Sequence, residues 1–255
     1  ANKQRASATN VEWTVDSLSA PQTAGISEGA DVTAFTDQFA GRARLGNRVQ
    51  KFRRDYMVSD MQEAVDSVGP AKIAQAEAKA IRELKRDIEA TIAGTQDSAV
   101  ENGAGVASQL RGLGDWLDGA AGGVPAAFQT PAASIAATGT AFSETILNSL
   151  ISSIFRVSGS ASNLMLVADT ALRQVIADFA RTSASATDNV RSVNYDGNSG
   201  SIKLSVDLYE SDHGVVSIVN QNPDCAPSFG GNTATGSGYI VNPEYYGIHE
   251  LIPMG

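Results

Sequence analysis

The sequence predicts an α+β protein, in which helices come first along the chain and antiparallel strands follow. Three observations support this prediction. Apolar residues recur at helical spacing over residues 71–93 and again over residues 142–159. Residues 202–208 alternate between apolar and polar side chains, which is typical of a half-buried strand. Only 2 of the 38 alanines lie beyond residue 200, whereas five of the six tyrosines lie at or after residue 195.

The first part of the chain is predicted to contain an arm followed by a hairpin. Residues 1–30 are small and polar with few anchors such as Trp13, so we expect an extended arm that lies on another surface. Residues 31–58 have hairpin character, because the Gly46–Asn47 pair suits a turn and residues 48–58 alternate like a strand. Neither face of this hairpin is purely apolar. It is therefore expected to project into solvent or to pack on a neighbour.

The best helix in the sequence follows this hairpin. Ser59 and Gln62 have the spacing of a capping box and predict the start of a short helix. A long helix is then expected over residues 71–93, with Gly94 as its C-terminal stop. At 1.5 Å per residue it would be about 35 Å long. Its apolar stripe consists of Ile73, Ala80, Ile81, Leu84, Ile88 and Ile92.

The remainder of the chain is predicted from the same periodicities. Residues 94–140 are rich in glycine, alanine and threonine, with Trp116 as an anchor. The later elements are expected as a helix over 142–159 that ends near Gly159, a buried strand over 164–167, a helix capped by Asp169, and strands over 202–208, 214–219, 238–241 and 246–252.

Charge is distributed unevenly along the chain. The formal net charge is −9, yet residues 1–86 contain 13 Lys and Arg against 11 Asp and Glu. Six cations and no acid lie between residues 42 and 54. A basic hairpin on an acidic body is complementary between copies of one protein, whereas a general nucleic-acid binder needs an overall basic surface. The cations expected to contact neighbouring subunits are Arg42, Arg44, Arg48, Lys51, Arg53 and Arg54, and Trp13 joins them as an apolar contact.

The sequence offers few residues for chemistry. One cysteine excludes an intrachain disulfide framework, and neither His213 nor His249 has the partner that a zincin motif requires. The glycines at 103–105 and 112–114 lack the lysine of a phosphate-binding loop. No apolar run approaches the ~20 residues of a membrane span. We therefore expect no enzyme activity, no metal or other cofactor, and no membrane partner.

Several segments resemble a family of tailed-phage major capsid proteins. The resemblance covers roughly residues 10–252, and the order of the elements is its most specific part. The segments that carry it are 44–65, 83–90, 164–169, 206–214 and 238–246.

The resemblance implies the Hong Kong 97-type fold and a structural function in an icosahedral shell around double-stranded DNA. It implies a homo-oligomer of hexamers and pentamers, with portal and decoration proteins as further partners. The protein would be assembled in the host cytoplasm and end in the virion. The implied parts are an N-terminal arm at 1–30, an E-loop hairpin at 31–58, a peripheral domain at 59–105 with its spine helix at 71–93, a mainly axial domain at 106–235, and strands at 236–255 that return to the peripheral domain.

Two other hypotheses remain open at the level of sequence. An encapsulin-like compartment would have the same fold but enclose a protein cargo. A soluble hydrolase would have to use His213 or His249, since the chain contains no other histidine.

Overall fold

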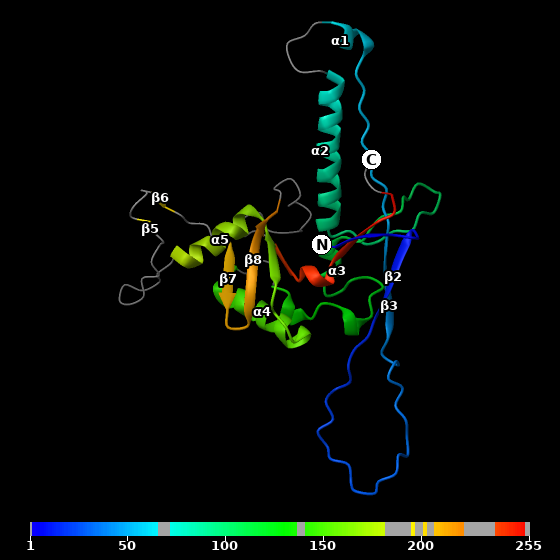
Figure 1. Cartoon of the computed structure of the whole chain (residues 1–255), viewed down its shortest axis with the longest axis vertical. Helices are drawn as coiled ribbons and strands as arrows, with labels where there is room; N and C mark the ends of the chain where they lie inside the picture. Colours follow the sequence, from blue (N-terminus) through cyan, green and yellow to red (C-terminus); the bar gives the residue numbers. More distant parts are fainter. Residues whose placement is uncertain are drawn as a thin grey trace.

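A computed structural model describes residues 2–65, 72–136, 141–181, 195–196, 201–202, 207–221 and 238–252. The described parts form an elongated molecule with a compact body on one side (Figure 1). Helix α2 (Lys72–Ala93) and a ribbon of β2 (Asn10–Val15) and β3 (Ala43–Arg48) lie along the long axis. The mixture of helices and strands agrees with the α+β prediction.

The body is built on a four-stranded sheet with the strand order β7-β8-β4-β9. Strand β4 (Leu164–Ala168) is central and pairs in parallel with β8 (Gly214–Asn220) and antiparallel with β9 (Gly238–Val241). Strand β7 (Leu208–Ser211) pairs antiparallel with β8. Residues 203–206 of the strand predicted over 202–208 lie outside the described residues. The late strands were expected to be antiparallel, and β8 departs from this expectation where it pairs in parallel with β4. The hairpin from β7 reverses the chain direction, so that β8 runs in the same direction as β4.

Helices α4 (Glu144–Ser158) and α5 (Thr170–Arg181) form one hydrophobic core with this sheet. Both helices were predicted, α4 with its end near Gly159 and α5 with its cap at Asp169, whereas the cap of α4 at Ser143 was not predicted. The Ser143 hydroxyl accepts a hydrogen bond from the Ile146 amide at 3.4 Å, and the Asp169 carboxylate accepts one from the Leu172 amide at 2.8 Å. Gly159 ends α4 in the left-handed conformation, with φ 71°. The most deeply buried side chains are Leu147, Ile151, Leu164, Ile176 and Val216.

Helix α2 agrees with the helix predicted over residues 71–93, but most of it is not covered by its own chain. Ala80 is the one residue of this helix that is buried, and Ile73 and Ile81 are 48% and 41% exposed. Helix α1 (Asp60–Ala64) precedes it with Ser59 at the N-cap position, although the Ser59 side chain makes no capping hydrogen bond. The part of the apolar stripe that contains Ile73 and Ile81 is therefore open to a partner.

The N-terminal arm and the hairpin differ from the prediction. Strand β2 lies within the predicted arm at 1–30, and it pairs antiparallel with β3 of the predicted hairpin at 31–58. Gly46 lies inside β3 opposite Glu12 rather than near a turn. Residues 49–58 form no strand, because the alternating pattern has no neighbouring strand to pair with. The ribbon is thus closed by a long loop over 16–42.

The two ends of the described chain pair with each other. Strand β1 (Asn2–Arg5) runs parallel to β10 (Gly247–Glu250), and the Ala6 amide donates to the Glu250 carbonyl at 2.9 Å. Within the range 236–255, β9 thus belongs to the body sheet and β10 pairs elsewhere. Four shorter elements and one hairpin complete the description: α3 (Leu113–Trp116), 3₁₀ turns at Ala126–Phe128, Ala132–Ser134 and Pro243–Tyr245, and β5 (Tyr195–Asp196) paired with β6 (Ser201–Ile202).

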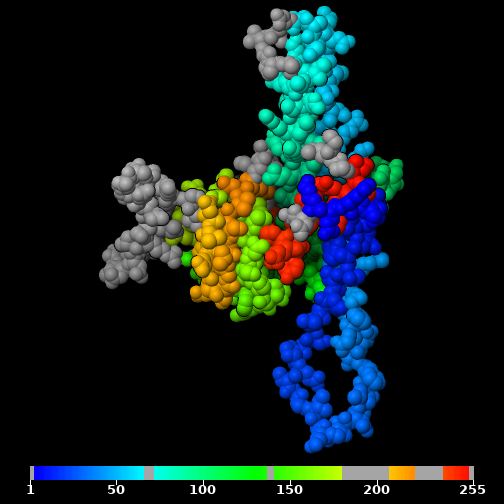
Figure 2. Space-filling model, in the orientation of Figure 1, coloured from blue at the N-terminus to red at the C-terminus, as the bar shows by residue number. Residues whose placement is uncertain are grey.

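The molecule exposes much more surface than a compact monomer of its size. Its accessible surface is 17936 Å². A compact monomer of 26.5 kDa would expose about 11,000 Å². The projecting loop and the long axis contribute to this surface (Figure 2). Among the described helices, none combines the length and apolar character that a membrane crossing requires.

Candidate assembly interface

The loop over residues 16–42 is the most exposed part of the described chain. Every residue in it is exposed, and Figure 2 shows it standing away from the body with open space inside it. Five large apolar side chains lie on this loop without burial. They are Leu18, Ile26, Val32, Phe35 and Phe39. A monomeric soluble protein rarely exposes so many apolar side chains together, so the loop has the character of an interface.

The base of this loop is closed by contacts between its two ends. The Arg42 Nε atom lies 3.4 Å from Asp16 Oδ2, and the Arg42 guanidinium lies over the Phe39 ring at 4.4 Å from its centroid. Both the ion pair and the cation–π contact are exposed and therefore weak individually. Together they hold the two ends of the loop next to each other, where β2 ends and β3 begins.

A second exposed segment, residues 49–58, connects the ribbon to α1 and runs alongside α2 (Figure 1). Its attachment to the helix is an ion pair in which the Arg54 guanidinium donates to both carboxylate oxygens of Asp87, with Nη2 2.7 Å from Oδ1. The hydrogen bond from Arg54 lowers the pKa of Asp87. At the far end of the segment Met57 is 94% exposed, and Met61 of α1 continues the apolar tip.

The structure pairs most of the predicted contact cations within the chain. Besides Arg42 and Arg54, Arg44 lies 3.5 Å from Glu12, and Arg53 lies 2.7 Å from Asp55. The contact of these cations with neighbouring subunits stays a prediction. In the part of the chain that the structure describes, the side chains of Arg48 and Lys51 have no carboxylate partner within 4 Å.

Trp13 packs within its own chain. Its ring lies on Trp116 of α3, with the ring centroids 5.6 Å apart and the planes tilted by 44°. It still leaves 41% of its surface exposed. Trp13 thus anchors the ribbon to the body, and the predicted contact with a neighbour can involve only its outer part.

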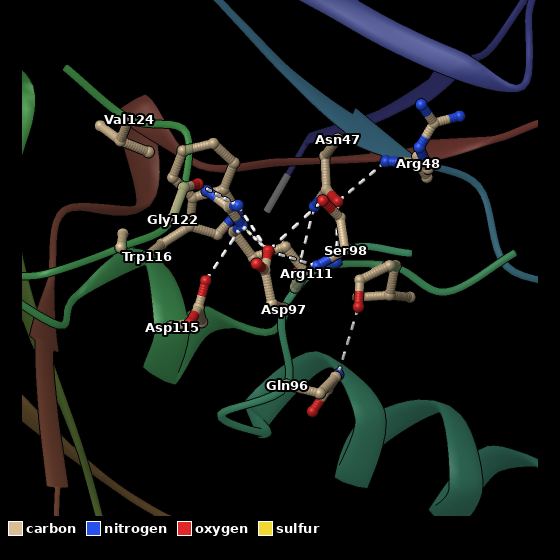
Figure 3. Close-up of polar contacts among 12 residues, drawn as sticks. Asn47, Arg48, Gln96, Asp97, Ser98, Arg111, Asp115, Trp116, Gly122 and Val124 are labelled. Carbon is tan, nitrogen blue, oxygen red and sulfur yellow. Dashed lines mark hydrogen bonds and ion pairs between the residues drawn. The ribbon is translucent and has the colours of Figure 1, made fainter. Parts of the chain in front are cut away.

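Arg111 lies at the centre of a polar cluster where β3, α3 and the end of α2 meet (Figure 3). Its side chain is only 7% exposed. The Nε atom lies 3.0 Å from Asp97 and 3.0 Å from Asp115. A terminal nitrogen also donates to the Gly122 carbonyl, and the guanidinium covers the Trp116 ring at 4.8 Å. The planar, multidonor guanidinium suits this arrangement better than an ammonium group would.

The two carboxylates around Arg111 differ in their environment. Burial raises the pKa of Asp115, with Arg111 opposing this effect and the nearby carboxylates Asp97 and Asp118 adding to it. Partial burial also acts to raise the pKa of Asp97, but hydrogen bonds from Arg111 and Ser98 outweigh it and lower that pKa. Asp97 is therefore the partner that stabilises the charged arginine most, while Asp115 bears a desolvation cost.

The two histidines lie apart and in ordinary structural positions. His213 is in the turn between β7 and β8 and stacks on Phe155 with a centroid distance of 6.3 Å. His249 lies in β10 opposite Gln4. Across the described residues, no group of three His, Cys, Asp or Glu side chains could hold a metal ion. Cys225 lies outside the described residues.

Sequence reasoning missed the loop and the Arg111 cluster. The apolar side chains of the loop are isolated between polar residues, so they give no periodic signal. Arg111 stands alone in a glycine-rich stretch, although Asp115 at the i+4 position and the adjacent Trp116 were visible as a local arginine-binding pattern.

A comparison with protein families matches the SU10 major capsid protein family over residues 1–255. The chain belongs to this family. It is a phage major capsid protein, which confirms the resemblance found in the sequence and does not favour the encapsulin or hydrolase alternatives. The comparison with curated proteins gives no match.

Membership of the family also fixes the general biological context of this capsid protein. A capsid protein is a component of the virion and assembles into a shell of many subunits. The family is structural, which indicates that the protein is not an enzyme. The exposed loop, the open face of α2 and the extended segment over 49–58 are then candidate subunit contacts.

Proposed function

We propose that this capsid protein forms an icosahedral shell in which the loop over 16–42 of each subunit lies on a neighbouring subunit. The observation that carries the proposal is the complete exposure of this loop together with its five apolar side chains. These side chains gain free energy only when another surface covers them, and burying one phenylalanine contributes about 2 kcal/mol. Many repeated contacts of this size add up to a stable shell.

The open apolar face of α2 supports the same proposal from the receiving side. Ile73 and Ile81 on this helix are large and exposed, and they lie on the stripe that a core would normally cover. The excess of accessible surface over that of a compact monomer supports extensive burial on assembly as well.

The proposed architecture is of the Hong Kong 97 type. In this assignment the ribbon and its loop are the E-loop, and α2 with the paired strands β1 and β10 belongs to the peripheral domain. The body formed by the four-stranded sheet, α4 and α5 is the axial domain. Hexamers and pentamers of this subunit would enclose double-stranded DNA inside the bacterial host, with portal and decoration proteins as further partners.

Charged contacts are a smaller part of the proposal. Arg48 and Lys51 are the cations of the original cluster that we propose to contact acidic surface on the next subunit. The remaining cations, Arg42, Arg44, Arg53 and Arg54, hold the ribbon, its loop and the following segment in shape through their own carboxylate partners. Exposed ion pairs contribute about 0–1 kcal/mol each, so the apolar loop dominates.

The substitution Phe35→Ser tests the proposal. Phe35 is 94% exposed, so the folded subunit should keep its unfolding midpoint. The association constant per contact should fall about thirtyfold, which corresponds to the loss of ~2 kcal/mol of burial. Particle yield would be measured by sedimentation and electron microscopy.

Tyr245→Ser is the matched control, because Tyr245 is a large side chain that is 82% exposed outside the loop. The proposal predicts that Tyr245→Ser assembles like the parent protein while Phe35→Ser does not. Equal particle yields for Phe35→Ser and the parent protein would contradict the proposed role of the loop.

A further inference from the structure

Asn47 forms a two-point contact between the ribbon and the segment that connects α2 to α3. Its side-chain oxygen accepts a hydrogen bond from the Arg111 amide at 2.8 Å, and its side-chain nitrogen donates to the Arg111 carbonyl at 3.1 Å (Figure 3). The side-chain amide of Asn47 thus makes the two hydrogen bonds to the Arg111 backbone that a residue of a neighbouring strand would make. Asn47 and Arg111 are nevertheless far apart in the sequence. Both hydrogen bonds are shielded from bulk solvent, because both residues are at least partly buried.

Neighbouring residues extend this contact along the chain. The Gln50 side-chain oxygen accepts a hydrogen bond from the Leu110 amide at 3.1 Å. The Ser108 hydroxyl donates to the Val49 carbonyl at 2.9 Å. Residues 47–50 are therefore clasped to residues 108–111 by side-chain hydrogen bonds, a set that we call the clasp.

The clasp is in turn attached to the end of α2. The Gly112 amide donates to the Gln96 carbonyl at 3.0 Å, and the Gly114 amide donates to the Gly94 carbonyl at 2.9 Å. The approach is so close that a Cβ atom on Gly112 would lie 2.1 Å from the Gly94 carbonyl oxygen. The ion pair between Arg111 and Asp97 reinforces this attachment. The clasp therefore connects the ribbon to the spine helix through hydrogen bonds.

Apolar packing alone would hold the direction of the ribbon poorly. No residue of β2 or β3 is buried, and Trp13 on Trp116 is the main ring contact that the ribbon makes with the body. The loop extends the ribbon by about 13 residues, or ~40 Å if fully extended. A rotation of the ribbon by about 10° would then move the loop tip by roughly 7 Å, which is more than the spacing of adjacent strands.

We infer that Asn47 is a positioning residue that fixes the direction of the ribbon, and with it the loop, relative to α2. The consequence for shell assembly rests on the proposed function, because it assumes that the loop contacts a neighbour. The positioning itself is a property of the single subunit. A loop that already points in one direction loses less conformational entropy when it binds its neighbour.

Distances between two spin labels on the unassembled full-length subunit test this inference. The labels are attached in a Cys225→Ser background through Thr14→Cys on β2 and Ala78→Cys on α2, both at exposed positions. We expect one narrow distance distribution in this parent. Asn47→Ala should at least double its width. Asn10→Ala in the same ribbon should leave it unchanged, because the Asn10 side chain donates to the exposed Glu12 side chain of the same strand and makes no other side-chain hydrogen bond among the described residues.

A second variant keeps the test decisive if Asn47→Ala reduces the yield of folded protein. Gln50→Ala combined with Ser108→Ala removes two hydrogen bonds of the clasp and leaves Asn47 in place, and it should broaden the distribution by a smaller amount. Distributions as narrow as that of the parent in all folded clasp variants would overturn the inference. The outcome is independent of Phe35→Ser, so a failure of the clasp and a failure of the loop interface can be told apart.

Discussion

Replacing Arg111 with alanine is expected to lower the free energy of unfolding by about 2–4 kcal/mol. The substitution leaves Asp115, whose side chain is only 16% exposed, without its cationic partner. It also removes the cation from the Trp116 ring and the donor from the Gly122 carbonyl. The expected loss is smaller than that of a fully buried ion pair, because Asp97 is 54% exposed and can be solvated by water. Urea unfolding of the unassembled subunit measures this loss.

Two companion variants show whether the geometry of the guanidinium matters. Arg111→Lys keeps the charge but loses the planar fork, and an intermediate loss is expected. Arg156→Ala removes an exposed arginine from α4 and should change the unfolding free energy by less than about 0.5 kcal/mol. Coincident unfolding curves for Arg111→Ala and Arg156→Ala would show that the Arg111 cluster does not stabilise the subunit.

The same substitution at two leucines is expected to have opposite effects on stability and assembly. Leu147 is fully buried between α4 and the sheet, whereas Leu18 in the loop is 100% exposed. Leu147→Ala should lower the free energy of unfolding by about 3–5 kcal/mol, because it removes buried methyl groups and leaves a cavity. Leu18→Ala should leave the unfolding free energy unchanged and reduce the yield of particles.

This pair of variants separates a folding defect from an interface defect. Thermal or urea unfolding gives the first quantity, and sedimentation of assembled material gives the second. A loss of stability in Leu18→Ala would mean that the loop packs on its own chain. An unchanged particle yield in the same variant would mean that Leu18 is not covered in the shell.

The elements that depend on local pattern could be predicted from the sequence. The apolar periodicity of α2 and α4, the cap at Asp169, and the end of α4 at Gly159 are all encoded within one or two turns of helix. These features can be read from the sequence because the residues that specify each element lie close together along the chain.

The arrangement of the ribbon could not be predicted in the same way. Strand β2 pairs with β3 across a long loop, and nothing local distinguishes that pairing from a hairpin closed near Gly46. The ion pairs within the chain could not be predicted for a related reason, since Arg54 is paired with Asp87 on a helix 33 residues away. The candidate interface thus depends on tertiary contacts, and only its basic character was visible beforehand.

The most direct test of this account is sedimentation velocity of the purified full-length chain, combined with electron microscopy of the fastest fraction. We expect hollow particles of megadalton mass built from many copies of the 26.5 kDa subunit. Phe35→Ser should shift the same material toward unassembled subunits. A parent chain that sediments only as a folded monomer under all assembly conditions would contradict the claim that its exposed loop and helix face are subunit contacts.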